Sequence, residues 1–258
     1  MKKIITTAVI QPNLHWEDAD ANYSLFEREI LNLREVPDLI VLPETFTTGF
    51  TMNVEDHADG EGKSVAWMRE MAGNKGCTIA GSVIIKEKQK YFNRLLWVEP
   101  TGKVVHYDKR HLFRMGREQL HFSPGNQRVV VTLGAFRFLL QVCYDLRFPV
   151  FARNRGDYDA ILYVANWPTA RQPVWETLLT ARAIENQAYV IAANRCGTDG
   201  EGMDNCGLSR VIDPRGNIKA RLDDQPGVLV SSLDLGELQS FRKKFPVHED
   251  ADDFRLLL

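Results

Sequence analysis

The sequence lacks the features of several protein classes. It has no Cys-x-x-Cys pair, and its cysteines are widely and irregularly spaced, which indicates neither a zinc site nor a disulfide framework. Its net charge is -2 and it has no polybasic block, so we expect neither nucleic acid nor a membrane as a partner. No apolar run reaches the roughly 18 residues of a membrane span, and the N-terminal apolar stretch is too short and too polar for a signal peptide. We therefore predict a cytoplasmic protein with reduced cysteines, at positions Cys77, Cys143, Cys196 and Cys206.

The composition is that of a globular protein with a large core. Hydrophobic residues make up 44% and charged residues 26% of the 258 positions. A chain of this length forms one large domain or two small ones. No linker or compositional break divides it, so we predict a single domain over residues 1–258.

Strand-like and helical patterns alternate along the chain. Continuous apolar runs predict buried strands, whereas apolar residues at helical spacing predict helices, the first of them capped by Asp18 or Asp20. Pro100-Thr101-Gly102 and Gly134 mark two hairpins. Pro149 suits the first turn of a helix that would end at Arg155, with Gly156 as its C-cap. This alternation is typical of the α/β class; the clearest strands are 4–10, 39–42, 138–142 and 160–165, and the clearest helices 21–33, 64–72 and 173–186.

Cys143 lies where the apolar strand 138–142 gives way to a turn and Pro149. Such a turn lifts the sulfur out of the sheet, and the free N–H groups of a helix start favour the thiolate. The backbone N–H of Tyr144 could then stabilise an oxyanion formed by attack from Cys143. The alternative is a buried core cysteine, which is the commoner fate of such a residue.

Two further chemical groups follow predicted strands. Glu44 ends the run Leu39–Leu42, where open α/β sheets place their chemistry, and burial would favour the neutral carboxyl and so make it a base near neutral pH. Lys109 follows the second strand of the Pro100 hairpin and could face a developing negative charge. The alternatives are a capping carboxylate and a surface charge run, and we assign Arg110 and His111 to the surface.

These pieces, in this order, resemble the nitrilase (carbon–nitrogen hydrolase) superfamily over nearly the whole chain. The resemblance implies a four-layer α-β-β-α sandwich and a triad of Glu44, Lys109 and Cys143. It also implies a second pocket carboxylate, placed at Glu118, and pairing of subunits through helices near Cys143 and through the C-terminal tail, about residues 243–258. The motifs are Leu42-Pro43-Glu44, Tyr107–Leu112, Cys143–Pro149, Asn166-Trp167-Pro168 and Ala181–Asn186.

Within the superfamily, the chain is most similar to the omega-amidase-like group. Asn166-Trp167-Pro168, followed by Arg171 and Trp175, and the segment from Phe245 to Phe254 carry that similarity. It implies hydrolysis of the terminal amide of 2-oxoglutaramate or 2-oxosuccinamate through a cysteine thioester. The distal carboxylate of such a substrate needs a cation, and an aromatic pocket wall is expected. The candidates for these roles are Trp167, Phe46, Arg114, Arg117 and Arg171.

Several alternatives stay open. Trp167 and Phe46 could instead cover the core or hold a loop, and we expect Arg147 to tie the Cys143 turn to a neighbouring carboxylate. The substrate could be another small amide, a nitrile or an N-carbamoyl compound. A catalytically silent binding protein would have lost a triad member, and none is lost here. We expect a homodimer or higher homo-oligomer that requires no metal or organic cofactor.

Overall fold

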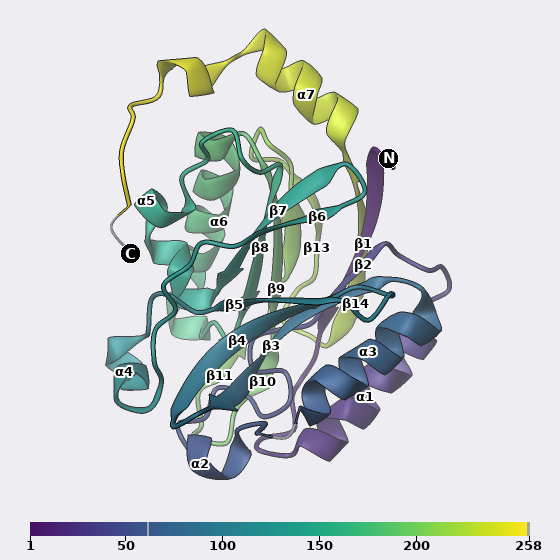
Figure 1. Cartoon of the computed structure of the whole chain (residues 1–258), viewed down its shortest axis with the longest axis vertical. Helices are drawn as coiled ribbons and strands as arrows, with labels where there is room; N and C mark the ends of the chain where they lie inside the picture. Colours follow the sequence, from purple (N-terminus) through teal and green to yellow (C-terminus); the bar gives the residue numbers. More distant parts are fainter. Residues whose placement is uncertain (61, 257–258) are drawn as a thin grey trace.

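The computed structural model describes residues 1–60 and 62–256, and it contains two six-stranded sheets that pack face to face. Helices cover the outer face of each sheet, which gives four layers in the order α-β-β-α (Figure 1). The predicted fold class is confirmed.

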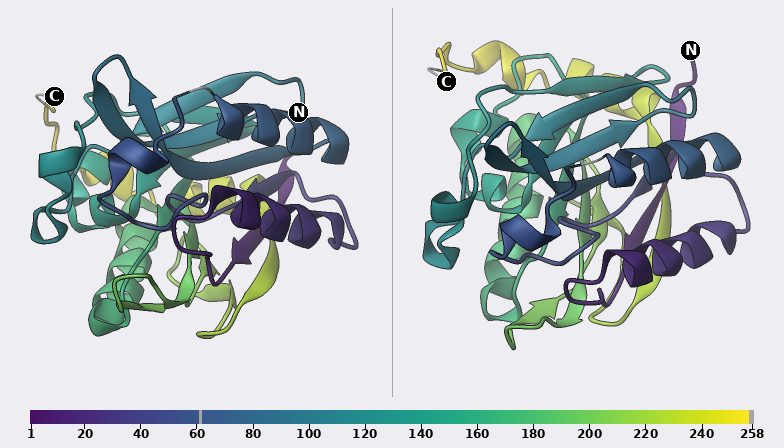
Figure 2. Two further views of the ribbon diagram at one scale, coloured as in Figure 1. Left: turned by 90° about the horizontal axis from the view of Figure 1, so that it is seen from below. Right: turned by 60° about the horizontal axis from the view of Figure 1, so that its bottom comes forward.

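The first sheet has the strand order β14-β1-β2-β3-β4-β5. Strands β1, β2 and β3 are parallel, and the remaining neighbours pair antiparallel. Helices α1 (Ala19–Leu31) and α3 (Lys63–Lys75) lie side by side on its outer face (Figure 2). The strands are β1 (Ile4–Gln11), β2 (Leu39–Val41), β3 (Thr78–Glu87), β4 (Lys90–Val98), β5 (Val104–Asp108) and β14 (Gly227–Asp234).

The second sheet has the order β13-β12-β9-β8-β7-β6, with β7, β8 and β9 parallel. Helix α6 (Gln172–Asn186) packs on its outer face through Trp175, Leu179 and Ala183. A short helix α5 (Pro149–Ala152) follows the end of β7. The strands are β6 (Val130–Leu133), β7 (Phe136–Val142), β8 (Ala160–Ala165), β9 (Tyr189–Asn194), β12 (Arg210–Ile212) and β13 (Ile218–Arg221).

Alternation along the strands builds the core between the sheets. In β7, Phe138, Leu140 and Val142 point into the central cluster, whereas Leu139 faces the helix layer. In β1, Val9 points inward and Ala8 faces α1 and α3. Because successive side chains of a strand point to opposite faces, a strand covered on both sides reads as a continuous apolar run.

Smaller elements complete the chain: α2 (Val54–His57), α4 (Glu118–His121), α7 (Leu235–Lys244) and a two-stranded hairpin of β10 (Cys196–Thr198) and β11 (Asp204–Cys206). Asp18 caps α1 by accepting a hydrogen bond from the Ala21 N–H at 3.0 Å, as predicted. The predicted helix 149–155 is too long, because α5 already ends at Ala152 and Gly156 caps no helix there.

The C-terminal segment returns from α7 toward α5 (Figure 1), where the Arg155 guanidinium lies 5.7 Å from the centre of the Phe254 ring. The predicted packing of this tail on a second subunit stays a prediction, and its last two residues, 257 and 258, lie outside the described part. Within the described residues, no helix is both long enough and apolar enough to cross a membrane.

Candidate active site

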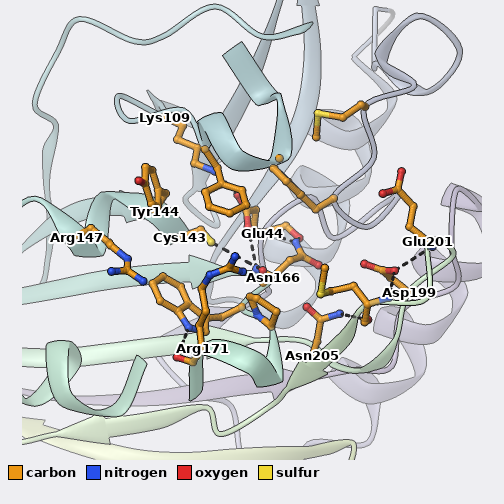
Figure 3. Close-up of a pocket in the computed structure, with 17 residues that line it drawn as sticks. Glu44, Lys109, Cys143, Tyr144, Arg147, Asn166, Arg171, Asp199, Glu201 and Asn205 are labelled. Atoms are coloured by element: carbon orange, nitrogen blue, oxygen red, sulfur yellow. Dashed lines mark hydrogen bonds and ion pairs between the residues drawn. The ribbon is translucent and has the colours of Figure 1, made fainter. Parts of the chain in front are cut away.

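Three strand ends bring a carboxylate, an ammonium group and a thiol to one rim of the sandwich. Glu44 follows β2, Lys109 follows β5, and Cys143 follows β7, so the site joins both sheets. Lys109 Nζ lies 2.8 Å from Glu44 Oε1, and all three side chains line the same pocket (Figure 3). The predicted juxtaposition of these residues is present.

Both oxygens of Glu44 are held by hydrogen bonds. Asn93 Nδ2 donates to Oε1 at 2.7 Å, and the Asn166 backbone N–H donates to Oε2 at 2.8 Å. The Asn166 side chain also donates to the Glu44 backbone oxygen at 2.7 Å. Glu44 is fully buried, so these contacts fix its orientation and offset the cost of removing its charge from water.

Lys109 lies between two buried carboxylates. Its Nζ is 3.0 Å from Glu118 Oε1, and Glu118 also accepts a hydrogen bond from the Phe113 N–H at 2.5 Å. Burial lowers the pKa of Lys109, but Glu118 and Glu44 raise it more, so the net pKa lies above the ordinary value and the ammonium keeps its charge. Burial raises the pKa of Glu118, and Lys109 opposes that shift.

Cys143 begins a short 3-10 helix, Cys143–Arg147, and has a φ of 46°, which a residue with a side chain rarely adopts. Burial raises the pKa of its thiol, the charge of Glu44 raises it further, and Lys109 lowers it in part. The net pKa is well above the ordinary value. The expectation that the helix start favours the thiolate stays a prediction, because burial and the charge of Glu44 account for the net rise.

The three side chains open onto a cavity of about 140 Å³, a size that suits one small molecule. Cations and acids line different parts of it: Arg147 and Arg171 lie near Cys143, whereas Asp199 and Glu201 lie on the β10–β11 hairpin (Figure 3). Within residues 1–60 and 62–256, no group of three or more His, Cys, Asp or Glu side chains is arranged to hold a metal ion. The remaining lining residues include Phe50, Met52, Phe113, Tyr144, Asn166, Trp167, Pro168, Met203 and Asn205.

A family model described as carbon-nitrogen hydrolase matches residues 6–243. The chain belongs to this family. It is similar to the omega-amidase YafV of Escherichia coli strain K12, with 48% identity over 249 residues that cover 96% of this chain and 97% of the relative. It is also similar to a 2-oxoglutaramate amidase of Bacillus subtilis strain 168, with 35% identity over 221 residues that cover 83% and 84%.

The solved structure of XC1258 from Xanthomonas campestris matches this carbon–nitrogen hydrolase with a TM-score of 0.96 and 41% identity, over 99% of this chain and 100% of that chain. That protein is described as a CN-hydrolase superfamily member with an arsenic adduct in its active site. The present chain is thus an amide-hydrolysing enzyme of the family.

Some of the candidate substrate-binding residues line the cavity, and others do not. Trp167 and Arg171 line the cavity of the hydrolase, and the indole N–H of Trp167 donates to the Arg171 backbone oxygen at 2.9 Å. Phe46 does not line it, because its ring is fully buried against Phe26 and Trp67 in the layer under α1 and α3. Arg114 is exposed and lines a separate hollow, so it is also outside the cavity.

Two expectations about basic residues of the hydrolase are corrected. Arg147 is exposed at the cavity, with its guanidinium 5.9 Å from the Trp167 ring, and no ion pair with a carboxylate is recorded for it in the described residues. His111 is not a plain surface residue, because its Nδ1 lies 2.7 Å from the buried carboxylate of Asp145.

Sequence reasoning missed two asparagines that bind Glu44. Asn93 is a buried polar residue within the apolar strand β4, and this interruption of the pattern is a signal that could have found it. Asn166 was used only as part of a family motif. The hairpin residues Asp199, Glu201 and Asn205 were also missed, because no local pattern in their glycine-rich stretch indicates the cavity.

Proposed function

We propose that this enzyme hydrolyses the terminal amide of a small oxo-dicarboxylate monoamide, 2-oxoglutaramate or 2-oxosuccinamate, to the acid and ammonia. The observation that carries the proposal is the contact of Lys109 with Glu44 beside Cys143 in a cavity for one small molecule, in a chain 48% identical to an omega-amidase. The residue roles below belong to this proposal.

The first half-reaction forms a thioester. Glu44 takes the proton of the Cys143 thiol, and the sulfur attacks the amide carbon. Lys109 Nζ and the Tyr144 N–H stabilise the oxyanion of the tetrahedral intermediate. Glu44 returns the proton to the nitrogen, the carbon–nitrogen bond breaks, and ammonia leaves with the acyl group on Cys143. The raised pKa of the thiol is the reason that this step needs Glu44 as a base.

The second half-reaction cleaves the thioester. Glu44 takes a proton from water, and the resulting hydroxide attacks the acyl carbon, with the same two donors at the oxyanion. The carbon–sulfur bond breaks, the acid is released, and Glu44 returns its proton to the sulfur. Glu118 also contacts the Lys109 ammonium, and its charge raises the pKa of Lys109, which favours the charged form.

The substrate's distal carboxylate requires a free cation in the cavity. Lys109 is paired with two carboxylates, whereas Arg171 and Arg147 line the cavity and make ring contacts with Phe113 and Trp167. We assign the distal carboxylate of the substrate to the part of the cavity lined by Arg147 and Arg171. Trp167 forms an apolar wall for the short carbon chain of the substrate.

Release of ammonia tests the substrate. The purified enzyme is assayed with 2-oxoglutaramate, 2-oxosuccinamate, a neutral aliphatic amide, an aliphatic nitrile and an N-carbamoyl amino acid. We expect the highest kcat/KM with an oxo-acid amide, by at least tenfold. A higher value with the nitrile or the N-carbamoyl compound would assign the enzyme to another substrate class within the family.

Cys143→Ala should abolish turnover and leave the fold intact, because the variant lacks the nucleophile but keeps the buried surroundings. Mass spectrometry of wild-type enzyme mixed rapidly with substrate should show an acyl adduct on Cys143 that the variant lacks. Residual turnover near the wild-type rate would remove Cys143 from the mechanism.

We also propose that the enzyme works as a homodimer in the cytoplasm. The support for an assembly is the family resemblance together with exposed apolar side chains at Val150 on α5 and at Phe245 after α7. All four cysteines are free thiols, which suits a reducing compartment. Light scattering on the purified protein measures the assembly.

A further inference from the structure

The carboxylate of Asp145 is fully buried two residues after Cys143, and it accepts four hydrogen bonds. The Tyr107 hydroxyl donates to Oδ2 at 2.7 Å, and the Val142 N–H donates to the same oxygen at 2.9 Å. The His111 backbone N–H donates to Oδ1 at 3.0 Å, and His111 Nδ1 lies 2.7 Å from that oxygen. Because an ionised carboxylate only accepts hydrogen bonds, His111 Nδ1 carries the proton.

These donors bracket two catalytic groups. Tyr107 and His111 lie two residues before and two residues after Lys109, and Val142 directly precedes Cys143. One side chain therefore ties the end of β5 in the first sheet to the end of β7 in the second. Burial raises the pKa of Tyr107 and Asp145 raises it further, so the phenol stays protonated and remains a donor.

The His111 ring also packs between two aromatic rings. It stacks on Phe148 with ring centres 3.8 Å apart and planes 7° apart, and it meets Phe151 edge-on at 5.2 Å. Phe148 belongs to the same turn as Cys143, so the ring clamps the turn from a second direction. The left-handed backbone of Cys143 costs free energy and persists only where its surroundings determine it.

We propose that Asp145 and His111 form a positioning pair that sets the location of the Lys109 ammonium group relative to the Cys143 sulfur. The proposal rests on the proposed catalytic roles of Lys109 and Cys143. Neither member of the pair lines the catalytic cavity, so neither touches the substrate. A shift of about 1 Å in a catalytic group lowers a rate by about 100-fold, which sets the size of the expected effects.

Two variants of His111 with matched shape separate positioning from packing. His111→Asn keeps an N–H donor near the place of Nδ1, and His111→Leu has the same branching without the donor. Both lose the ring stack on Phe148 equally. We expect kcat of His111→Leu to fall about 100-fold, with KM within threefold of wild type. We expect kcat of His111→Asn to be at least tenfold higher than that of His111→Leu. Equal kcat values in the two variants would overturn the proposal.

A second pair of variants covers the case in which His111→Leu fails to fold. Asp145→Asn keeps the shape of the side chain, but its amide N–H₂ group replaces an oxygen that accepts two hydrogen bonds, and an N–H₂ group cannot accept them. We expect a loss in kcat similar to that of His111→Leu. The control is Asp159→Asn. Asp159 directly precedes β8, at the end of that strand away from the cavity residue Asn166. Its buried carboxylate also accepts four hydrogen bonds, from Arg137 and Arg242. The control should lower the melting temperature and keep kcat within twofold. Wild-type kcat in Asp145→Asn would refute the proposal.

A readout that needs no substrate separates this proposal from the proposed function. Iodoacetamide alkylation of Cys143, followed by peptide mass spectrometry, reports how well Glu44 and Lys109 support the thiolate. We expect alkylation to be about tenfold slower in His111→Leu than in His111→Asn. If wild-type enzyme hydrolyses none of the amides and this ratio still holds, the substrate assignment fails and the positioning pair stands. Equal alkylation rates in the two His111 variants would refute the positioning pair.

Discussion

The ammonium group of Lys109 compensates the charges of two buried carboxylates in the site. Its side chain is 1% exposed and contacts Glu44 and Glu118, which are both fully buried. A buried ammonium group with two acceptors is held in one place, and removing either carboxylate would leave a buried charge with poorer compensation. The same arrangement explains why Lys109 cannot also bind a carboxylate of the substrate.

Arg171 is the residue whose replacement best tests the direction of substrate binding. Arg171→Gln should raise KM for a carboxylate-bearing amide at least tenfold, because a charge-assisted hydrogen bond is lost, and should change KM for a neutral amide less than twofold. Steady-state kinetics measure both. Arg114→Gln, on an exposed side chain outside the cavity, is the matched control and should resemble wild type. An unchanged KM in Arg171→Gln would leave Arg147 as the cation.

The sequence predicts the catalytic candidates that follow strands, but it does not predict the residues that hydrogen-bond to them. Glu44, Lys109 and Cys143 each follow a predicted strand, so their position at one rim follows from the pattern. Asn93 and Asn166 contact Glu44 across 49 and 122 positions of the chain. The Asn93 contact depends on the strand order within the first sheet, and the Asn166 contact depends on how the two sheets face each other, so no local pattern contains either.

The start of α3 shows how a single acid organises an element. Asp59 accepts hydrogen bonds from the N–H groups of Gly62, Lys63 and Ser64 at 2.7, 3.1 and 2.7 Å. Burial raises the pKa of Asp59, but the bonds from Ser64, Gly62 and Lys63 lower it more, so the net pKa lies below the ordinary value. The ionised form therefore stabilises the fold.

Asp59→Ala should destabilise the protein by about 1 kcal/mol at pH 7, which is the usual cost of a lost cap. Since the folded pKa is depressed, this contribution is present above the unfolded pKa of about 3.9 and is lost as the pH falls through the folded value. Denaturant unfolding of wild type and variant at pH 7 and pH 3 should show a smaller difference at pH 3. Asp56→Ala, an exposed acid on α2, is the control, and a pH-independent difference at Asp59 would contradict the argument.

Elements with a strong period are predictable, and those fixed by distant partners are not. Helices α1, α3 and α6 and most strands lie within a few residues of their predicted bounds. No strand is predicted for the β10–β11 hairpin, because residues 196–207 contain four glycines. Its strands are fixed from outside, through bridges from Asn13 to Cys196 and from Pro168 to Asn205.

The two sheets of the molecule share one core. Trp97 on β4 and Phe138 on β7 are fully buried, and their ring centres lie 5.5 Å apart across the interface between the sheets. The apolar faces of both sheets contribute to the same cluster. Neither sheet could keep this face in water, so we expect the sheets to fold and unfold together.

Phe138→Ala should destabilise the protein by about 3–5 kcal/mol through the cavity that it leaves. Urea unfolding followed by tryptophan fluorescence and by circular dichroism should give coincident single transitions in wild type and in the variant. Two separated transitions would mean that the predicted single domain is wrong. The sequence indicates one domain by its lack of a linker, whereas the pairing of the two sheets across the core becomes visible only in the structure.

The place of β14 has a consequence for synthesis on the ribosome. Strand β1 is synthesised long before β14 (Gly227–Asp234), which covers one of its edges. An uncovered strand edge is a template for pairing with other chains. Until Gly227–Asp234 has left the exit tunnel, that edge needs shielding, and chaperone demand should fall sharply once β14 is released.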